Sequence, residues 1–201
     1  MKHKEVKKTG SFTLKSKFGN FTLTGYEIDN NTKERFALAI VKGKVKNKED
    51  VYVRIHSQCI FAEVFGSYLC DCKEQLDKSL ELIAKNGGVL IYLDQDGRGH
   101  GLLTKIKEYS MQENGYDTYE ASIKVGVLPD NRTYKYGIQI LESLGVKGVK
   151  LITNNPEKIN AIQLSNLKFS GRIPVETKPN KHNIHYLKTK KKKFAHLLDH
   201  L

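Results

Sequence analysis

The sequence predicts a mixed α/β fold in which an antiparallel, β-rich N-terminal part precedes alternating helices and strands. Apolar and polar residues alternate in stretches up to about residue 55, as in half-buried strands. From Lys73 onward, helical spacings alternate with short unbroken apolar runs. The 201 residues contain no internal repeat and no Pro/Ser-rich linker, so we expect a single domain over residues 1–201.

The N-terminal strands are predicted from period-two stretches in three segments. These segments are SFTLKSKFGNFTLTGYEI at 11–28, ERFALAIVKGKV at 34–45 and VYVRI at 51–55. Turn residues lie within the first segment, at Gly19-Asn20, and between the first and the second, at Asp29-Asn30-Asn31. Short connections of this kind favour antiparallel pairing of neighbouring strands.

The first helix is predicted from Lys73 onward, because Leu76, Leu80 and Ile83 then share one helical face. Asn86-Gly87-Gly88 ends this helix, since glycine readily adopts a left-handed cap. Val89 to Leu93 is an unbroken apolar run, which is typical of a strand covered on both faces.

The remaining predicted elements continue the alternation of helix and strand. We expect helices from about Leu102 to Gln112 and from about Asn131 to Leu144, and a strand at Val149–Thr153. A last helix begins with Asn155 as its cap and Pro156 at its first position.

The cysteines are the strongest chemical signal in the chain. All three lie in one C-x10-C-x-C segment formed by Cys59, Cys70 and Cys72. Three thiolates without a fourth cysteine suggest a zinc ion with one coordination position open for water. Two alternatives remain at this point: the thiols are merely small buried apolar groups, or His56 completes a sealed structural site. A disulfide is disfavoured because the count is odd and Cys70 and Cys72 are close in sequence.

The charge balance points to a polyanionic partner. The chain carries 34 Lys and Arg against 22 Asp and Glu, a net charge of +12. Lysines at both ends, including Lys188 and Lys190 to Lys193, are interpreted as solvated faces. No apolar run approaches the roughly 18 residues of a membrane span, and the N-terminus lacks an apolar core for export, so we expect a cytoplasmic protein that does not enter membranes.

A zinc-stabilised basic module that binds nucleic acid is the alternative from another functional class. Its aromatic residues are not interleaved with the basic runs as in a stacking platform, so we expect no nucleic-acid partner. A deaminase-like enzyme is weaker still, because the P-C-x-x-C signature is absent.

The loop DQDGRGHG at residues 94–101 is the second chemical signal. It follows a predicted buried strand, precedes a helix and places glycines at 97, 99 and 101. Bare backbone N–H groups and a helix N-terminus can hold phosphates in such a loop, and Arg98 adds a charged fork. The loop matches neither a Walker A motif nor a dinucleotide fingerprint, so it gains weight only beside the cysteines.

Longer blocks follow one another from about residue 50 to the C-terminus. They are RIHSQC, CDCKEQL, DGRGHGLLTKIKEYSMQENGYDT, LPDNR, LITNNPEK and HYLKTKKKKFAHLL. In these blocks and their spacing the chain resembles the GTP cyclohydrolase II family. Members of this family are zinc enzymes that catalyse the first step of riboflavin biosynthesis. The resemblance implies a homodimer that takes GTP as its small-molecule substrate, with Mg²⁺ assisting at the triphosphate.

The resemblance also implies roles for individual residues. Cys59, Cys70 and Cys72 match the zinc ligands, and Tyr109 matches a catalytic tyrosine. Asp130 matches the proton acceptor and Arg132 the nucleophile. The positions that match substrate contacts are Arg54, Ile55, His56, Ser57, Gln58, Gln75, Asp96, Gly97, Arg98, Thr118, Thr153 and Lys158.

The implied reaction opens the imidazole ring of GTP, releases formate and pyrophosphate, and leaves a diaminopyrimidinone ribosyl phosphate. A guanidinium stays protonated because its pKa exceeds about 12, so physical chemistry favours Arg132 as a group that grips the α-phosphate. Glutamate is usual in the family at Gln58 and Asp96, and arginine and an aliphatic residue are more familiar at Asp94 and His100. These departures leave open a specialised paralogue with another nucleotide preference, or one that stops at a ring-opened intermediate.

Overall fold

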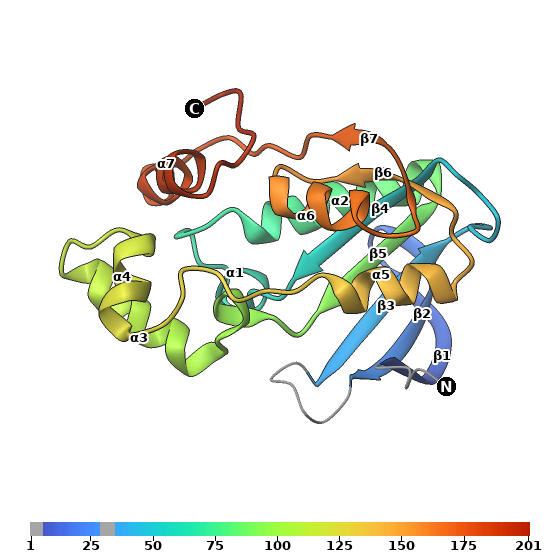
Figure 1. The fold of residues 1–201 in the computed structure, drawn as a ribbon, viewed down its shortest axis with the longest axis horizontal. Coiled ribbons are helices and arrows are strands. Elements are labelled where there is room, and N and C mark those ends of the chain that lie inside the picture. The colour runs from blue at the N-terminus through green and yellow to red at the C-terminus, as the bar shows by residue number, and fades with distance from the viewer. Residues whose placement is uncertain (1–5, 29–34) are drawn as a thin grey trace.

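The computed structural model describes residues 6–28 and 35–201, which form a seven-stranded mixed sheet with helices on both faces (Figure 1). The order of strands across the sheet is β1-β2-β3-β5-β4-β6-β7. The strands are β1 (Val6–Ser16), β2 (Gly19–Ile28), β3 (Phe36–Lys42), β4 (Val51–Ser57), β5 (Gly88–Leu93), β6 (Gly148–Ile152) and β7 (Lys168–Ile173). The predicted mixed α/β fold class is confirmed.

The N-terminal half of the sheet is antiparallel, as predicted from the alternating pattern. β1 pairs with β2, β2 with β3, and β3 with β5, all antiparallel. The tight turn between β1 and β2 lies at residues 17–18 and not at Gly19-Asn20, because Gly19 already pairs with Ser16. The predicted turn at residues 29–31 lies outside the described residues.

The C-terminal half of the sheet is parallel and creates the edge that carries the site. β4 lies between β5 and β6 and runs parallel to both, and β7 extends the parallel part beyond β6. β7 was not expected from the sequence, because KFSGRI combines few apolar residues with a glycine. The carboxyl ends of three neighbouring strands therefore meet at one edge, where α/β folds commonly bind ligands.

Helices cover both faces of the sheet. They are α1 (Ile60–Glu63), α2 (Cys72–Asn86), α3 (Leu102–Glu113), α4 (Thr118–Val125), α5 (Lys135–Ser143), α6 (Pro156–Gln163), α7 (Ile184–Lys193) and the 3-10 turn η1 (Asp96–Gly99). On one face Ile83 of α2 packs with Leu90 and Ile152. On the other face Ile140 of α5 and Ile162 of α6 join the larger core. Figure 1 shows α3, α4 and α7 gathered at the end of the sheet toward which β4 points.

The third predicted helix starts later than expected. The sequence predicted a start at Asn131, but α5 begins at Lys135. The Asn131 amide donates a hydrogen bond to the Arg98 carbonyl at 3.1 Å, which holds this segment against η1 and outside the helical path. Tyr134, which caps the helix, is buried in the larger core. Tertiary contacts therefore override the helical pattern at these four residues.

Other elements follow the prediction closely. α2 ends at Asn86, and Gly87 has a positive φ of +76° as its cap. α6 begins after Asn155, whose side chain accepts a hydrogen bond from the Glu157 amide at 2.9 Å. α4 and α7 were not predicted as helices. Within the described residues, no helix combines the length and apolar character that crossing a bilayer would need.

Gly88 lies where β5 passes closest to its neighbour, and its replacement tests the packing of the sheet. A Cβ at Gly88 would lie 2.2 Å from the Tyr52 carbonyl oxygen, and its φ is +148°. We expect Gly88→Ala to lower the free energy of unfolding by about 1–3 kcal/mol in urea titrations. Gly10→Ala is the control, because a Cβ at Gly10 meets nothing within 4 Å. Equal stabilities of the two variants would contradict this explanation.

Candidate active site

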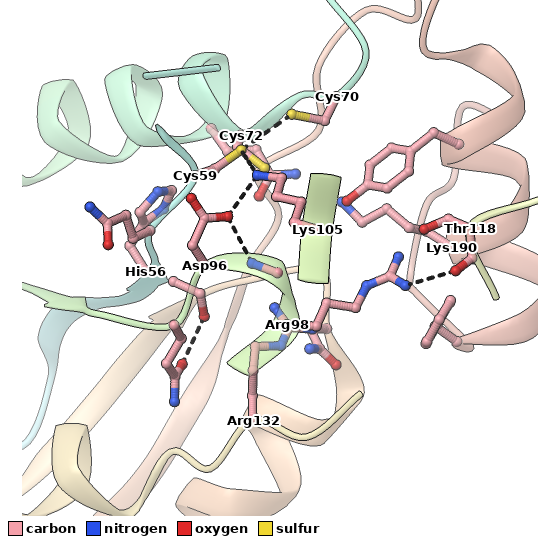
Figure 2. Close-up of a pocket in the computed structure, with 18 of the residues that line it drawn as sticks. His56, Cys59, Cys70, Cys72, Asp96, Arg98, Lys105, Thr118, Arg132 and Lys190 are labelled. Atoms are coloured by element: carbon pink, nitrogen blue, oxygen red, sulfur yellow. Dashed lines mark hydrogen bonds and ion pairs between the residues drawn. The ribbon is translucent and has the colours of Figure 1, made fainter. Parts of the chain in front are cut away.

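The site lies at the carboxyl ends of β4, β5 and β6. Residues that follow these strands line one cavity with about 1010 Å³ of atom-free space, part of it open to solvent. Its walls also include side chains from α2, α3 and α7. Eighteen residues were singled out from the sequence as metal ligands, catalytic residues or substrate contacts. All of them except Ile55 and Asp130 line this cavity. Figure 2 shows the cysteines and the positive side chains facing the same space.

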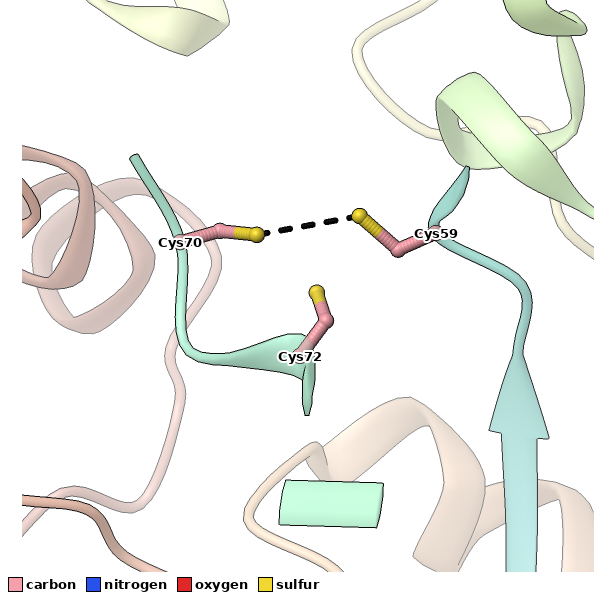
Figure 3. Close-up of side chains that lie close together, drawn as sticks. All are labelled: Cys59, Cys70 and Cys72. Atoms are coloured by element: carbon pink, nitrogen blue, oxygen red, sulfur yellow. Dashed lines mark hydrogen bonds between the residues drawn. The ribbon is translucent and has the colours of Figure 1, made fainter. Parts of the chain in front are cut away.

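The three cysteines converge at one side of the cavity. Their Sγ atoms all lie within 4.8 Å of one another, and Cys59 Sγ is 3.7 Å from Cys70 Sγ (Figure 3). A disulfide needs about 2.05 Å between sulfurs, so the thiols are not bonded. Tetrahedral zinc with Zn–S distances of about 2.3 Å places two sulfurs about 3.8 Å apart. The sulfur spacing therefore fits a metal ion.

The electrostatics of the thiols also call for a cation. Hydrogen bonds from Cys70 and Cys72, with Lys105 nearby, lower the pKa of Cys59. The interaction with Cys59 raises the pKa of Cys70 to about 12, and it likewise raises the pKa of Cys72. The protein alone thus stabilises one thiolate, and a divalent ion would be needed to hold all three.

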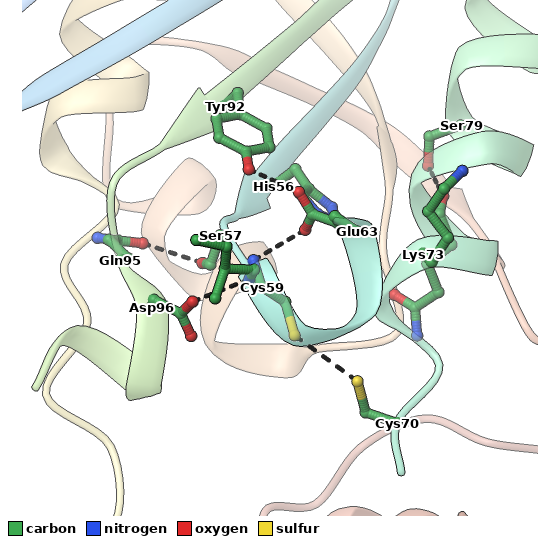
Figure 4. A network of polar contacts seen from close by, with 12 residues as sticks. His56, Ser57, Cys59, Glu63, Cys70, Lys73, Ser79, Tyr92, Gln95 and Asp96 are labelled. Atoms are coloured by element: carbon green, nitrogen blue, oxygen red, sulfur yellow. Dashed lines mark hydrogen bonds and ion pairs between the residues drawn. The ribbon is translucent and has the colours of Figure 1, made fainter. Parts of the chain in front are cut away.

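His56 does not serve as a fourth ligand in this arrangement. Its Nε2 lies 2.9 Å from Glu63 Oε1, and its Nδ1 lies 3.4 Å from the Arg54 guanidinium (Figure 4). Burial lowers the pKa of His56 to about 4, so the imidazole is neutral at pH 7. The cysteine cluster contains no histidine or carboxylate ligand among the described residues. The sealed site with His56 as fourth ligand is therefore not formed.

Glu63 is a buried carboxylate that organises the first cysteine. Its Oε1 accepts a hydrogen bond from the Cys59 amide at 2.8 Å, and its Oε2 accepts one from the Tyr92 hydroxyl at 2.5 Å. The same Oε1 contacts His56, whose ring stacks on Tyr92 with centroids 5.7 Å apart. Figure 4 shows these groups around the turn that carries Cys59. This network fixes the direction of the Cys59 side chain.

Lys105 connects the cysteines to the glycine-rich loop. Its Nζ lies 3.1 Å from Cys59 Sγ and 2.7 Å from Asp96 Oδ1, and only 8% of the residue is exposed. Asp96 also accepts hydrogen bonds from the Gly97 and Ile60 amides at 2.7 and 2.9 Å. The contacts with Cys59 and Asp96 outweigh burial and raise the pKa of Lys105, so its ammonium is charged beside the thiol cluster.

A second buried network runs from β4 to α7. Arg54 donates to Gln75 Oε1 at 2.8 Å and to the Ile152 carbonyl at 3.0 Å. Gln75 in turn donates to Asp71, whose other oxygen is 3.0 Å from Lys190 Nζ. Despite burial, Lys190 keeps the pKa of Asp71 below its usual value. Lys190 is therefore a buried ion-pair partner, which corrects its interpretation as part of a solvated terminal face.

Arg132 and Asp130 form a bidentate ion pair. Arg132 Nε is 2.9 Å from Asp130 Oδ1, and Arg132 Nη2 is 2.5 Å from Oδ2. Although burial opposes charge on both groups, the pair lowers the pKa of Asp130 and raises that of Arg132. Arg132 lines the cavity, whereas Asp130 does not. The geometry makes Arg132 a permanent cation and Asp130 the group that orients it.

Lys158 is, with Arg54, one of the two most buried cations of the site. It is 5% exposed, and its Nζ donates to the Ile55 carbonyl at 2.8 Å. No carboxylate pairs with it among the described residues. Burial and the neighbouring Arg54 and Arg132 charges lower its pKa well below the ordinary value. A ligand anion at this point would favour the charged form of Lys158 and provide the missing partner.

The predicted phosphate loop forms the short turn η1. Gly97 and Arg98 have φ values of +59° and +52°, and Arg98 Nη1 lies 3.4 Å from the Thr118 and Pro129 carbonyls. Thr118 is the first residue of α4, while Thr153 follows β6 and bonds the Asn155 amide at 3.0 Å. These residues surround the same cavity.

Tyr109 lies on α3 with its ring 5.6 Å from that of Phe61. Burial raises its pKa, so the phenol is protonated at neutral pH and can donate a hydrogen bond. Ser57 donates to Gln95 at 3.0 Å, and the Gln58 amide donates to the Leu93 carbonyl at 2.9 Å. Ile55 is fully buried in the larger core and contributes only its carbonyl, through Lys158.

The unusual residues of the loop have local partners. Asp94 accepts a hydrogen bond from the Arg35 amide at 3.2 Å, and His100 Nε2 lies 2.8 Å from the Leu128 carbonyl. Both contacts tie the loop to neighbouring segments, and neither residue lines the main cavity. Of the departures from the familiar pattern, Gln58 and Asp96 alone line it.

Sequence reasoning missed several site residues. Glu63, Asp71, Lys105 and Phe194 contact singled-out residues, and Lys190 pairs with Asp71. Lys105, Lys190 and Phe194 line the cavity. Two signals in the sequence were available. Glu63 lies four residues after Cys59, and Asp71 lies between two cysteines in the C-x-C motif. The lysines and Phe194 approach from distant segments and carry no local signal.

A three-thiol cluster that could hold a metal, beside a cavity lined by buried cations, is typical of metal-dependent enzymes that act on phosphorylated small molecules. Residues 7–174 match the family model of GTP cyclohydrolase II, and the chain belongs to this family. The resemblance stated from the sequence is thereby confirmed.

Curated relatives agree with this assignment. The chain is 48% identical to the riboflavin biosynthesis protein RibBA of Bacillus velezensis, over 96% of this chain and 48% of that one. The RibBA proteins of Bacillus subtilis and Aquifex aeolicus are 47% and 46% identical, also over 96% of this chain and over 48% and 47% of theirs. The chain thus spans about half the length of the curated relatives it matches.

Among solved structures, the chain resembles RibBX, a two-domain 3,4-dihydroxy-2-butanone 4-phosphate synthase from A. baumannii. The TM-score is 0.50 and the identity 24%, over 88% of this chain and 42% of that one. At this identity the likeness supports the fold alone.

Lys105→Met tests the contact between Lys105 and the thiol cluster. It removes the ammonium at Cys59 and Asp96, and we expect metal affinity to fall about 10- to 100-fold because this group orients and neutralises a ligand thiolate. Competition with a chromophoric zinc chelator measures the affinity. Lys107→Met, an exposed position on the same helix, is the control. If both variants bind zinc as tightly as the wild-type protein, Lys105 has no role at the metal.

Proposed function

We propose that this protein is a zinc-dependent GTP cyclohydrolase II. It opens the imidazole ring of GTP, releases formate and pyrophosphate, and leaves a diaminopyrimidinone ribosyl phosphate, the first step of riboflavin biosynthesis. The observation that carries the proposal is the convergence of three cysteine sulfurs within 4.8 Å at a cavity lined by six Lys and Arg side chains, in a chain of this family.

The thiol cluster would hold the zinc ion. Its three soft sulfur donors suit zinc, and the cluster provides no fourth protein ligand among the described residues. When bound, zinc supplies a Lewis acid that lowers the pKa of coordinated water from about 15.7 to about 7. Glu63 holds Cys59 through its backbone amide, and Lys105 holds it through its sulfur.

The cations of the cavity would bind the triphosphate. Lys158 needs an anionic partner, and Arg54 has a buried Nε without a hydrogen-bond partner in the described structure. Arg98 and Arg132 approach the same space from η1 and from the segment before α5. Their combined charge would stabilise the negative charge that develops when the bond between the α- and β-phosphates breaks.

Two further side chains are suited to proton control. Tyr109 stays protonated and can donate a hydrogen bond to a developing negative charge on the opened ring. Asp130, assigned by resemblance as the proton acceptor, has both carboxylate oxygens engaged by Arg132. We therefore assign Asp130 to orient Arg132, and Arg132 to grip the phosphate.

Other parts of the proposal extend the resemblance. Mg²⁺ would accompany the triphosphate, residues 1–201 would act as a single domain, and the protein would form a homodimer in the cytoplasm. Exposed apolar side chains beside the site support an interface, since Phe65 is 72% and Leu103 77% exposed. Gln58 and Asp96 line the cavity and are the positions at which a specialised paralogue would differ.

Product analysis tests the proposed function. Zinc-loaded protein with Mg²⁺ and GTP should yield formate and pyrophosphate in equal amounts, together with the ring-opened nucleotide, as measured by mass spectrometry. Unchanged GTP in the presence of protein with confirmed zinc content would falsify the proposal. Formate without pyrophosphate would identify the specialised paralogue.

Cys70→Ser should lose zinc and ring opening together, because it removes one of three ligands.

Arg132→Ala separates the two hydrolytic steps. We expect pyrophosphate release to fall about 100- to 1000-fold, the range for loss of one electrostatic group that stabilises a transition state. Parallel assays of formate and pyrophosphate measure the effect. Arg35→Ala, at an exposed arginine before β3, is the control. Normal pyrophosphate release by Arg132→Ala would exclude this role.

A further inference from the structure

The C-terminal end of α7 forms part of the cavity wall although it lies beyond residues 7–174, which match the family model. Lys190 and Phe194 line the cavity, as does His196 just after the helix. Four contacts fix this segment in place. Lys190 pairs with Asp71, Lys193 pairs with Asp117 and Glu120 at the start of α4, and the Leu197 amide donates to the Asn154 carbonyl at 2.8 Å.

Phe194 makes a direct contact with the phosphate loop. The guanidinium carbon of Arg98 lies 4.3 Å from the centroid of the Phe194 ring, within the range of a cation–π interaction. The other contacts of this guanidinium are long, at 3.4 Å to the Thr118 and Pro129 carbonyls. Arg98 belongs to no ion pair within residues 6–28 and 35–201. The aromatic face of Phe194 is therefore a main contact of the guanidinium, beside two long hydrogen bonds to carbonyls.

The backbone is strained on both sides of this contact. Three non-glycine residues in the described chain have positive φ, and two of them are Arg98 at +52° and Ala195 at +52°. Such conformations cost free energy and persist where the surroundings require them, often at ligand sites. Ala195 lies between Phe194 and His196, so its conformation sets the direction of two side chains that line the cavity.

We propose that Phe194 is a positioning residue that holds the Arg98 guanidinium ready for the phosphate chain of the substrate. Stacking on the ring fixes the plane of the guanidinium while its N–H groups remain free to bind phosphate oxygens. Preorganisation of this kind lowers the entropy lost when the ligand binds. The inference rests on the proposed function, which makes a nucleoside triphosphate the ligand of this cavity.

Binding of inorganic tripolyphosphate to zinc-loaded protein tests the inference without turnover. With excess Mg²⁺, calorimetry should show about 5- to 30-fold weaker binding by Phe194→Leu, from the strength of a cation–π contact. Phe194→Tyr keeps an aromatic face and should restore wild-type binding. Binding of guanosine, which has no phosphate, should be the same in all variants. Phe12→Leu, at an exposed phenylalanine of β1, is the matched control.

A double-mutant cycle shows whether Phe194 acts through Arg98. Arg98→Ala should weaken tripolyphosphate binding, and adding Phe194→Leu to it should cause no further loss. Additive losses, or wild-type binding by Phe194→Leu, would overturn the inference. Formate release from GTP is measured separately. Wild-type protein that binds tripolyphosphate but releases no formate would refute the proposed function, while the cycle would still decide the role of Phe194.

Discussion

The concentration of positive charge around one buried cavity is the constraint on which the structure of the site depends. Arg54, Arg98, Arg132, Lys158 and Lys190 line the same space, and Lys158 is only 5% exposed. Like charges in a low-dielectric interior repel strongly, so each cation needs neighbouring acceptors that stabilise it. The sheet makes this possible because three parallel strands end at one edge. There the carbonyl oxygens of Ile55 and Ile152 accept hydrogen bonds from Lys158 and Arg54. The fold therefore supplies neutral acceptors where carboxylates would compete with a ligand.

The metal cluster and the cationic cavity are linked by shared side chains. Asp71 lies between Cys70 and Cys72 and also pairs with Lys190, while Lys105 joins Cys59 to the loop that carries Arg98. A displacement of the thiol cluster would therefore shift the cations of the cavity, and the reverse also holds, since buried hydrogen-bonded networks move as units. Under the proposed function, this coupling would allow metal-dependent ring opening and binding of the phosphates in one cavity.

Local patterns in the sequence predicted the antiparallel strands, α2, β5 and the cap of α6, because each of these elements satisfies its own periodicity. The thiol cluster was also predictable, since its three members fall in one short segment. The partners of that cluster were not. Lys105 and Lys190 reach Cys59 and Asp71 across 46 and 119 residues of sequence, and only tertiary folding brings them together. The start of α5 was predicted wrongly for the same reason, because the contact between Asn131 and Arg98 replaces a helical turn.

The partners of the cations divide them into two groups with different roles. Lys105 and Lys190 each contact a buried carboxylate, so their charges are compensated within the protein and serve to position Cys59 and Asp71. Lys158 and Arg98 contact carbonyls and aromatic rings, which leave a net positive charge in the cavity. Arg132 is intermediate between the two groups. Its bidentate pair with Asp130 fixes the direction of the guanidinium, but Asp130 itself does not line the cavity. A bound polyanion would lower the free energy of the second group far more than that of the first. The arrangement of partners, more than the total charge of +12, would therefore determine where the phosphates of the proposed substrate bind.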